Sequence, residues 1–140
     1  MPAIRWPLTY VILMGVVALA SSLWRTYGAS ETCEMDGQEL SPALRVDLTM
    51  ADGTSHAFCT IACAQSWLAD QPNITPKQAT VRDAITGEPV DAYTAFFVQS
   101  KLVTNRANAN NIHAFRFRTD AAEHVRQFGG RLIADPFSVE

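Results

Sequence analysis

All three cysteines of the chain fall in two short stretches, and their spacing indicates metal chemistry. Cys59 and Cys63 are four residues apart, so their thiols lie on one face if this segment is helical. Cys33 is followed two residues later by Met35, which places a thioether beside the third thiol. Soft sulfur ligands of this kind select Cu(I) or Zn(II) over hard cations. The sequence therefore predicts a metal-binding module with Cu(I) as the cargo and Zn(II) as the alternative.

Two other uses of the cysteines remain open. A structural disulfide is the natural alternative in an exported protein, and residues at i and i+4 are close enough for a Cys59–Cys63 bridge. A bridge from Cys33 to either of them would leave one odd thiol. A closed structural Zn(II) site is the second alternative, and it needs a fourth strong ligand. A nearby histidine would favour Zn(II), whereas Met35 would favour Cu(I).

The first half of the soluble part has strand, strand, helix, strand patterns. Residues 45–50 alternate apolar and polar side chains as a half-buried strand does, and Asp52-Gly53 then predicts a hairpin turn. Residues 55–58 return as a strand that delivers Cys59 at its end. The next patterns are a helix and a third strand, over residues 60–68 and 79–85.

The second half of the chain repeats this order. The expected strand, polar loop, strand, helix and strand cover residues 92–100, 104–111, 112–118, 120–128 and 131–134. Thr119 is the expected N-cap of the helix, and Gly129-Gly130 is its expected end. His56-Ala57-Phe58 and His113-Ala114-Phe115 occupy the same place in the two halves. We therefore expect an α+β fold of two strand-strand-helix-strand units, over 30–87 and 88–140.

Residues 1–29 are predicted to be a separate membrane-anchor or signal segment. An uncharged apolar run extends from Leu8 to Leu23, with Arg5 before it and Arg25 after it, which is typical of a membrane-spanning anchor helix. The cleavage pattern that ends at Ala20 also fits a secretory signal peptide. We expect the cysteine-bearing part on the periplasmic, extracytoplasmic side, anchored in the inner membrane or secreted if the chain is cut after Ala20.

Composition and motifs argue against several function classes. The net charge is -3 and the 11 Lys and Arg residues are dispersed, so the chain has no basic footprint for nucleic acid. The sequence has no nucleophile elbow, phosphate-binding glycine loop or H-E-x-x-H helix. The three residues between Cys59 and Cys63 also differ from the C-x-x-C spacing of thiol–disulfide exchangers. We therefore predict a binding protein and not an enzyme.

A set of short motifs extends over the chain from Cys33 onward. They are Cys33-x-Met35, Phe58-Cys59-x-x-x-Cys63, Val81-Arg82-Asp83, Asp91-Ala92, Ala95-Phe96-Phe97-Val98, Ala114-Phe115 and Gly129-Gly130-Arg131. Together they resemble the NosL family, which are accessory copper-binding proteins for the assembly of nitrous oxide reductase. The three cysteines separately resemble a TRASH-type metal-binding signature. The resemblance implies two strand-strand-helix-strand units, an exported location and delivery of Cu(I) to a copper enzyme.

Two features depart from that family. Its members usually carry a lipidated cysteine at the mature N-terminus, where this chain is expected to have a membrane anchor. Many also hold a methionine, regarded as a copper ligand, in the loop before the last Ala-Phe strand. The corresponding loop here, residues 106–111, contains no sulfur. His113 borders this loop and is the candidate ligand of the second half.

The histidines and the remaining methionine of the soluble part receive different expectations. His56 lies in a strand beside an apolar phenylalanine and is expected to be a structural residue. His124 is next to Glu123 and is expected on the exposed face of a helix. Met50 alternates with Leu48 on a strand and is expected in the core.

The leading prediction is a membrane-tethered Cu(I)-binding protein that passes copper to a client enzyme or to another copper carrier. Thiolate and thioether ligands would be exchanged in that transfer. The alternative is a structural Zn-binding or disulfide-stapled interaction domain without metal transfer. The candidate metal ligands are Cys33, Met35, Cys59, Cys63 and His113.

Overall fold

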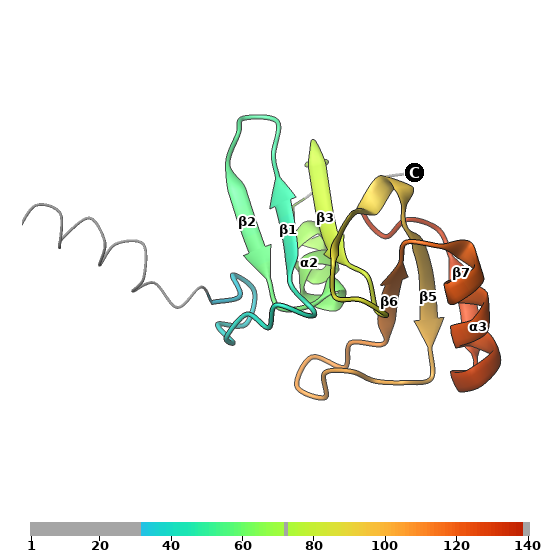
Figure 1. Ribbon diagram of the computed structural model, residues 1–140. Helices are drawn as coiled ribbons and strands as arrows, with labels where there is room; N and C mark the ends of the chain where they lie inside the picture. The colour runs from blue at the N-terminus through green and yellow to red at the C-terminus, as the bar shows by residue number, and fades with distance from the viewer. Residues whose placement is uncertain (1–31, 72, 139–140) are drawn as a thin grey trace, which may run out of the picture. The chain divides into compact units, whose positions relative to one another are not determined.

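The chain forms two antiparallel sheets in the part described by this computed structural model, residues 32–71 and 73–138. The first sheet has the order β2-β1-β3-β4 and the second the order β6-β5-β7 (Figure 1). Their strands are β1 (Val46–Thr49), β2 (Ser55–Phe58), β3 (Gln78–Arg82), β4 (Pro89–Asp91), β5 (Phe96–Ser100), β6 (Ile112–Phe115) and β7 (Gly130–Ile133). The helices are α2 (Ile61–Ala69), the 3-10 helix η1 (Ala92–Thr94) and α3 (Arg118–Phe128). A mixed fold with two antiparallel sheets and two α-helices is thus confirmed.

The two sheets share one pairing pattern. In each, the first strand in sequence is central and pairs on one side with the second strand and on the other with the strand after the helix. Phe58 pairs with Val46 in the first sheet, as Phe115 pairs with Phe96 in the second. His56 and His113 occupy the matching register, opposite Leu48 and Val98. The two His-Ala-Phe motifs therefore occupy equivalent positions in the two sheets.

The main core lies between the sheets and against α2. Val46, Leu48 and Val81 of the first sheet, Ala64 of α2 and Phe97 of the second sheet are buried in one cluster. Met50 is buried in this cluster too, as predicted. Burial of such side chains contributes about 1.5–3 kcal/mol each and supplies most of the driving force for folding. The three cysteines lie at the edge of this same cluster, so the core holds the sulfurs in place.

Helix α3 covers the outer face of the second sheet. Val98 and Phe115 pack on that face against Ala121 and Val125 of the helix. Figure 1 shows α3 beside β5 and β7, on the side away from α2. Strands β5 and β6 are therefore largely buried on both faces, which fits their short runs of consecutive apolar residues, whereas β7 stays mostly exposed.

Asp83 joins the two sheets directly after β3. Its carboxylate is 2% exposed and accepts hydrogen bonds from the Thr86 hydroxyl (2.8 Å) and the Arg116 N–H (3.4 Å). The Ala84 N–H donates to the Ala114 carbonyl at 2.8 Å, and Asp83 and Ala114 form a parallel bridge. The predicted strand over 79–85 ends at Arg82, because Asp83 starts this tight turn.

The predicted strand over 92–100 is wrong in its first part. Residues 89–91 pair with β3 as β4, and the chain then makes the 3-10 turn η1 before β5 starts at Phe96. The Asp91 side chain accepts the Tyr93 N–H at 3.0 Å and so caps this turn. An aspartate that hydrogen-bonds the backbone two residues on favours a turn over a continuous strand.

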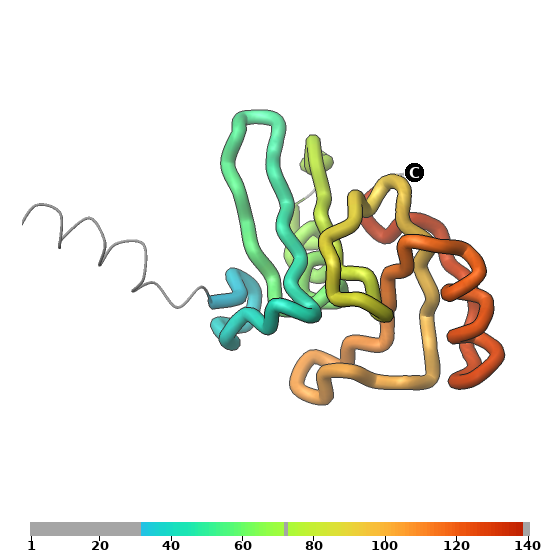
Figure 2. Tube along the Cα trace, viewed as in Figure 1, coloured from blue at the N-terminus to red at the C-terminus, as the bar shows by residue number. Residues whose placement is uncertain are grey.

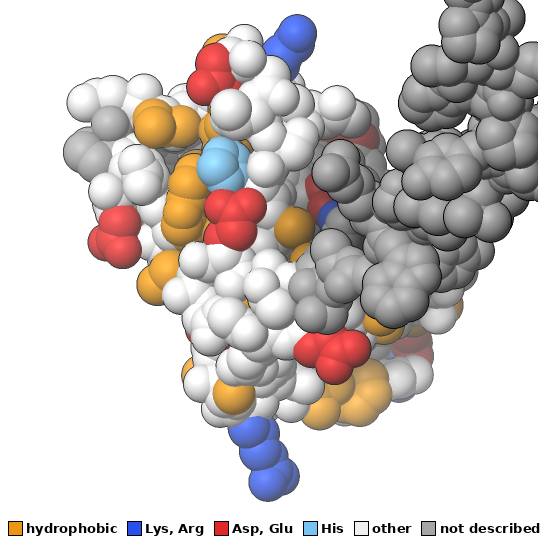
Figure 3. All heavy atoms as spheres, turned by 90° about the vertical axis from the view of Figure 1, so that its left-hand side faces the viewer, with side chains coloured by type: hydrophobic (Ala, Val, Ile, Leu, Met, Phe, Trp, Pro, Cys, Tyr) orange, Lys and Arg blue, Asp and Glu red, His pale blue; other side chains and the backbone are white. Residues whose placement is uncertain are grey.

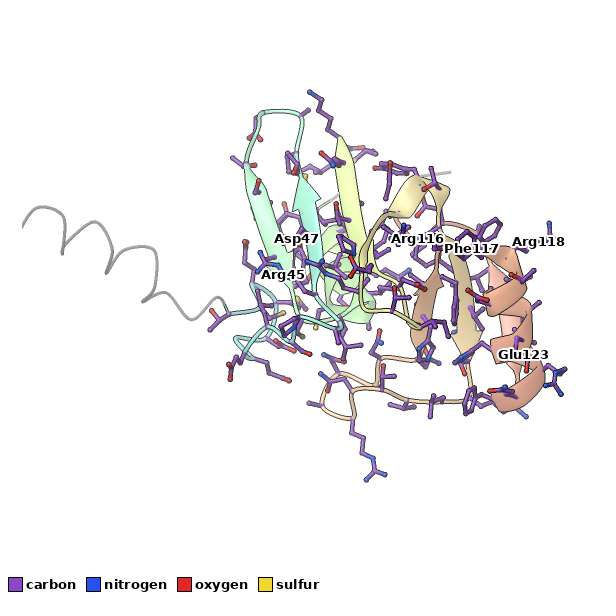
Figure 4. The ribbon with its side chains drawn as sticks, viewed as in Figure 1. Arg45, Asp47, Arg116, Phe117, Arg118 and Glu123 are labelled. Carbon is purple, nitrogen blue, oxygen red and sulfur yellow. The ribbon has the colours of Figure 1, made fainter. Side chains whose placement is uncertain are left out.

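The prediction that Thr119 caps the last helix is also wrong. The helix begins one residue earlier, at Arg118, and its N-cap is Phe117, whose side chain makes no capping hydrogen bond. Figure 4 shows Arg116, Phe117 and Arg118 at this junction between β6 and α3. Arg116 donates to the Pro89 carbonyl at 3.2 Å and so fixes the chain just before the helix. Tertiary contacts thus set the helix start in place of a capping side chain.

The predicted membrane-anchor segment, 1–29, lies outside the described residues. Among the helices of the described part, none has the length and apolar character needed to cross a membrane.

Candidate metal centre

A tight loop between the N-terminal segment and β1 positions Cys33. The Cys33 N–H donates to the Gln38 carbonyl (2.7 Å), and the Gly37 N–H donates to the Cys33 carbonyl (2.8 Å). Gly37 has a φ of 70°, a value that glycine adopts without strain. The Glu34 N–H donates to the Ala57 carbonyl at 3.1 Å, which attaches the loop to the end of β2. Cys33 is consequently brought next to Cys59 although 26 residues separate them in sequence.

Cys59 and Cys63 are positioned by the start of α2. Thr60 is the N-cap, and its hydroxyl accepts the Cys63 N–H at 3.3 Å. Cys59 precedes the cap and Cys63 lies in the first turn, so both thiols reach the same side of the helix start. Their sulfurs are 3.5 Å apart. Two sulfurs bound at about 2.3 Å to one tetrahedral ion would be about 3.8 Å apart, so this separation suits ligation of one ion.

Asp36 is the fourth member of the cluster. Ligand atoms of Cys33, Asp36, Cys59 and Cys63 all lie within 4.8 Å of one another. The Cys63 thiol lies 3.2 Å from one carboxylate oxygen of Asp36, and the Cys59 thiol 3.5 Å from the same oxygen. Burial raises the pKa of Asp36, but hydrogen bonds from the Cys33 thiol, the Gln38 N–H and the other two thiols outweigh it and lower the pKa to about 2. The cluster therefore contains one carboxylate that is ionised at neutral pH.

The Cys59 and Cys63 thiols are held in the protonated form. Burial raises the pKa of Cys63 to about 11, and the hydrogen bond with Asp36 acts in the same direction. Burial, together with the neighbouring Cys63 and Cys33, raises the pKa of Cys59 well above its usual range. The Cys59 and Cys63 thiols are therefore neutral at pH 7, and a metal that binds them as thiolates must displace their protons.

The long connection between β5 and β6 reaches the cluster from the second sheet. Figure 2 shows this connection running back toward the segment that follows residue 32. The Asn108 side-chain amide lies 3.2 Å from the sulfur of Cys59, 3.3 Å from that of Cys63 and 3.5 Å from an oxygen of Asp36. Asn110 is buried and accepts the Ala62 N–H at 3.2 Å, which attaches the connection to the first turn of α2.

A cavity opens beside the sulfurs. It has a volume of about 300 Å³, and Met35, Asp36, Cys63 and Asn108 are among its lining residues. Met35 lies in the loop of Cys33 and is 41% exposed. Its thioether lies on the cavity wall with Cys63, where it can meet a ligand or metal that enters.

His113 is placed elsewhere in the structure. It is buried in the second sheet, and its Nε2 donates to the Leu102 carbonyl at 3.1 Å. Its ring lies 4.6 Å from that of His124, between centroids. It does not belong to the group of ligand atoms around the cysteines. His113 was favoured because it borders the connecting loop, but Asn108 and not His113 reaches the cluster from that loop.

His124 was expected on the helix surface, and this is wrong. It is 8% exposed, and its Nε2 is 3.0 Å from the Ser100 hydroxyl. Burial and the neighbouring His113 hold its pKa below the usual range. The helix rotates this histidine toward the second sheet, because Ala121 and Val125 share its inward face.

His56 has the structural role expected of it. Its Nδ1 lies 2.6 Å from a carboxylate oxygen of Glu34, and its ring packs on Trp67 with centroids 4.6 Å apart. Figure 3 shows a histidine in contact with an acidic side chain, beside hydrophobic side chains, on this face. The pair holds the loop of Cys33 against β2.

The structure therefore brings three of the five predicted ligands together. Cys33, Cys59 and Cys63 form the cluster, with Met35 beside it on the cavity wall. Sequence reasoning missed Asp36 and Asn108. Asp36 follows Cys33 by three residues in a tight loop, which is a local signal that could have been used. Asn108 is 45 residues from Cys63 along the chain, and no signal in a single sequence connects the two.

Comparison with known proteins identifies a related fold. No protein-family model matches the sequence, and no curated protein matches it. The structure is similar to the crystal structure of the copper chaperone NosL from Shewanella denitrificans, with a TM-score of 0.64 and 22% sequence identity. The match covers 74% of this chain and 86% of that one. The fold thus confirms the resemblance to NosL that the motifs indicated, and the centre it carries is a cluster of three thiols and a carboxylate.

Proposed function

We propose that this protein is a copper carrier: it binds one Cu(I) at Cys33, Cys59 and Cys63 and passes it to a protein partner. The observation that carries the proposal is the convergence of three thiols, from two segments of the chain, within 4.8 Å. Thiolates are the ligands that Cu(I) prefers. The structure described as a copper chaperone has the same fold, which supports a carrier over a catalyst.

Transfer would proceed by exchange of sulfur ligands at the cavity. Loading of Cu(I) displaces the protons of the thiols that bind it, and these protons leave to water. A thiolate or thioether of the partner then enters the cavity beside Cys63 and replaces one ligand at a time. Met35 is neutral and lies on the same wall, so it can hold the ion weakly while a thiolate is released.

The first test is a Cu(I) competition titration of the full-length chain under reducing conditions, with a chromogenic Cu(I) chelator. We expect one tightly bound Cu(I) per chain and its loss in the Cys33→Ser, Cys59→Ser double variant. His113→Gln is the control, because His113 lies outside the cluster, and it should bind like the parent. A double variant that binds Cu(I) like the parent would contradict the proposal.

A structural Zn(II) site is the second candidate, and Asp36 is the observation that favours it. With three thiolates and one carboxylate the cluster offers the four ligands that structural Zn(II) takes. A Zn(II) titration in parallel, followed by thermal unfolding, separates the two functions. Tight Zn(II) binding with a large rise in Tm, and no transfer of Cu(I), would show that the cluster is a structural Zn(II) site and not the site of a copper carrier.

A disulfide-stapled domain without metal is the remaining alternative. All three cysteines are in the thiol form in the structure, with the sulfurs of Cys59 and Cys63 3.5 Å apart. Bridging would shorten this separation to about 2.05 Å. Mass spectrometry of the chain isolated without reductant would reveal a bridge as the loss of two hydrogens.

The location and the partner are parts of the same proposal. Residues 1–29 would tether the protein to the inner membrane, with the metal centre on the periplasmic side. The client would be a copper enzyme such as nitrous oxide reductase, or another copper carrier. Cell fractionation with protease treatment of intact spheroplasts tests the location: the tagged chain should sediment with membranes and be cut from outside. A protected, cytoplasmic chain would contradict it.

A further inference from the structure

Asn108 occupies an unusual place in the cluster. A single side-chain amide donates toward two sulfurs and one carboxylate oxygen, at 3.2 Å from Cys59, 3.3 Å from Cys63 and 3.5 Å from Asp36. It is the amide nitrogen that faces the cluster, because the amide oxygen accepts the Asn110 N–H at 3.3 Å. An amide NH2 has no lone pair to give to a metal. This side of the cluster therefore offers hydrogen-bond donors and no ligand.

The orientation of Asn108 is fixed by the rest of its loop. The Asn110 side chain donates to the Thr104 hydroxyl (2.9 Å) and to the Ile112 carbonyl (3.2 Å), and it accepts the Ala62 N–H (3.2 Å). Ala109, between the two asparagines, has a φ of 53°, a strained value for a residue with a side chain. The loop is thus held in a conformation that points the Asn108 amide at the sulfurs.

The two candidate cargoes differ in what they need from Asp36. Zn(II) takes four ligands, so it needs the carboxylate in addition to the three thiolates. Cu(I) is satisfied by two or three soft ligands and gains little from a hard carboxylate oxygen. A hydrogen bond from Asn108 to the same oxygen competes with Zn(II) for it, whereas hydrogen bonds to the sulfurs stabilise bound thiolates with either metal.

We infer that Asn108 is a positioning residue that sets the metal selectivity of the cluster: it holds Asp36 as a hydrogen-bond acceptor and so favours Cu(I) over Zn(II). The inference rests on the proposed function, because it describes how the same site discriminates between metals. All three sulfurs of the centre come from residues 33–63. The inference gives the connection between β5 and β6, which carries Asn108, a role in the same centre.

Two variants test it by the ratio of Cu(I) to Zn(II) affinity in the full-length chain. Asn108→Leu removes the donors at similar size, and Asn108→Asp replaces them by a second carboxylate. Changes to residues that support metal ligands alter affinity about 10–100-fold. We expect both variants to lower the Cu(I)/Zn(II) affinity ratio by at least about tenfold. In Asn108→Leu the lost hydrogen bonds to the sulfurs weaken both metals alike, while the released Asp36 carboxylate favours Zn(II). In Asn108→Asp the second carboxylate strengthens Zn(II) binding further.

Asn111→Ala is the matched control, since Asn111 is in the same loop and its side chain makes no hydrogen bond to any described residue. Its affinity ratio should equal that of the parent. Far-UV circular dichroism and Tm show whether each variant folds. If Asn108→Leu does not fold, Asn108→Ala removes the same donors and takes its place.

A double-variant cycle with Asp36→Asn separates positioning from a general loss of structure. Because Asn108 acts on Zn(II) through Asp36, the effect of Asn108→Leu on the ratio should shrink to less than threefold in the Asp36→Asn background. A ratio within threefold of the parent in Asn108→Leu would overturn this inference and leave the proposed function intact. A parent chain that binds no Cu(I) would overturn the proposed function with it.

Discussion

Asp36 determines how many ligands the cluster can offer. Its carboxylate is within reach of all three thiols and stays ionised at neutral pH, since hydrogen bonds lower its pKa to about 2. The loop that carries it is only six residues from Cys33 to Gln38, so the carboxylate and the Cys33 sulfur are fixed as one unit. A single substitution of Asp36 can therefore change the affinities for Cu(I) and Zn(II) by different amounts without removing any sulfur ligand.

Asp36→Asn should weaken Zn(II) binding more than Cu(I) binding. The amide oxygen is a poorer ligand than a carboxylate, so loss of the fourth strong ligand should cost Zn(II) about 10–100-fold in affinity. Cu(I), held by thiolates, should change by less than about fivefold. Parallel competition titrations measure both, and Glu39→Gln, an exposed carboxyl of the same loop, is the control. An equal loss for the two metals would show that Asp36 ligates both.

The affinity for either metal should rise steeply with pH. The pKa of Cys63 is raised to about 11 and that of Cys59 is raised above its usual range, so both thiols carry protons at pH 6–8. Each proton that the metal displaces increases the apparent affinity about tenfold per pH unit below the thiol pKa. Asp36, with a pKa of about 2, adds nothing to this dependence in that window.

Titrations at pH 6, 7 and 8 with a pH-corrected competitor measure the slope. Loss of two thiol protons predicts about a hundredfold rise per pH unit, and loss of one predicts about tenfold. An affinity independent of pH would show that the thiols are ionised before the metal binds. Proton release into a weakly buffered solution gives the number of protons independently.

Among the secondary-structure elements, the first turn of α2 positions the site. Thr60, between Cys59 and Cys63 in the sequence, is the N-cap of this helix, and the cap sets the orientation of the turn that carries the second thiol. The loop of Asn108 attaches to this same turn through Asn110 and Ala62. One helix end therefore organises groups from both sheets.

Thr60→Ala should destabilise the fold and loosen the site. Loss of an N-cap hydroxyl costs about 0.5–2 kcal/mol. Because Thr60 is buried, we expect the free energy of unfolding to fall by about 1 kcal/mol or more. Urea unfolding of the metal-free chain followed by circular dichroism measures it. Thr60→Ser keeps the hydroxyl and should retain most of the stability. Equal losses for the two variants would assign the effect to the lost methyl group and not to the cap.

In the molecule as a whole, the two sheets meet at Asp83. The buried carboxylate ties the turn after β3 to the backbone of Arg116, after β6. The loop of Asn108 connects two strands of the second sheet, whereas the sulfurs lie beside the first sheet. This junction keeps the loop close to the sulfurs. The cluster consequently depends on the relative position of the two sheets.

Asp83→Ala should lower the free energy of unfolding by about 1–3 kcal/mol, because the buried Asp83 side chain accepts hydrogen bonds from Thr86 and Arg116 and both are lost. Glu88→Ala, an exposed carboxyl near the same turn, is the control and should change stability by less than about 0.5 kcal/mol. Urea unfolding measures both variants. A loss of less than about 0.5 kcal/mol for Asp83→Ala would show that the junction does not depend on this carboxylate.

Local patterns in the sequence were enough to predict most of the secondary-structure elements and the sulfur ligands. Alternating and helical patterns located β1, β2, α2, β5, β6, α3 and β7 to within a few residues. The i, i+4 spacing placed Cys59 and Cys63 together, because helix geometry is a local property. The same local rules failed at Asp91 and Thr119, where a side-chain turn and a contact with Pro89 outweighed strand and cap preferences.

The distant groups that complete the site depend on packing between the sheets. The addition of Asn108 to the cluster, the separation of His113 from it and the burial of His124 all depend on how the second sheet packs against the first and against α3. Such contacts join residues tens of positions apart and arise from the burial of a shared core, which no local pattern encodes. Spacing in the sequence thus predicted the sulfurs, and packing between the sheets supplied the groups that surround them.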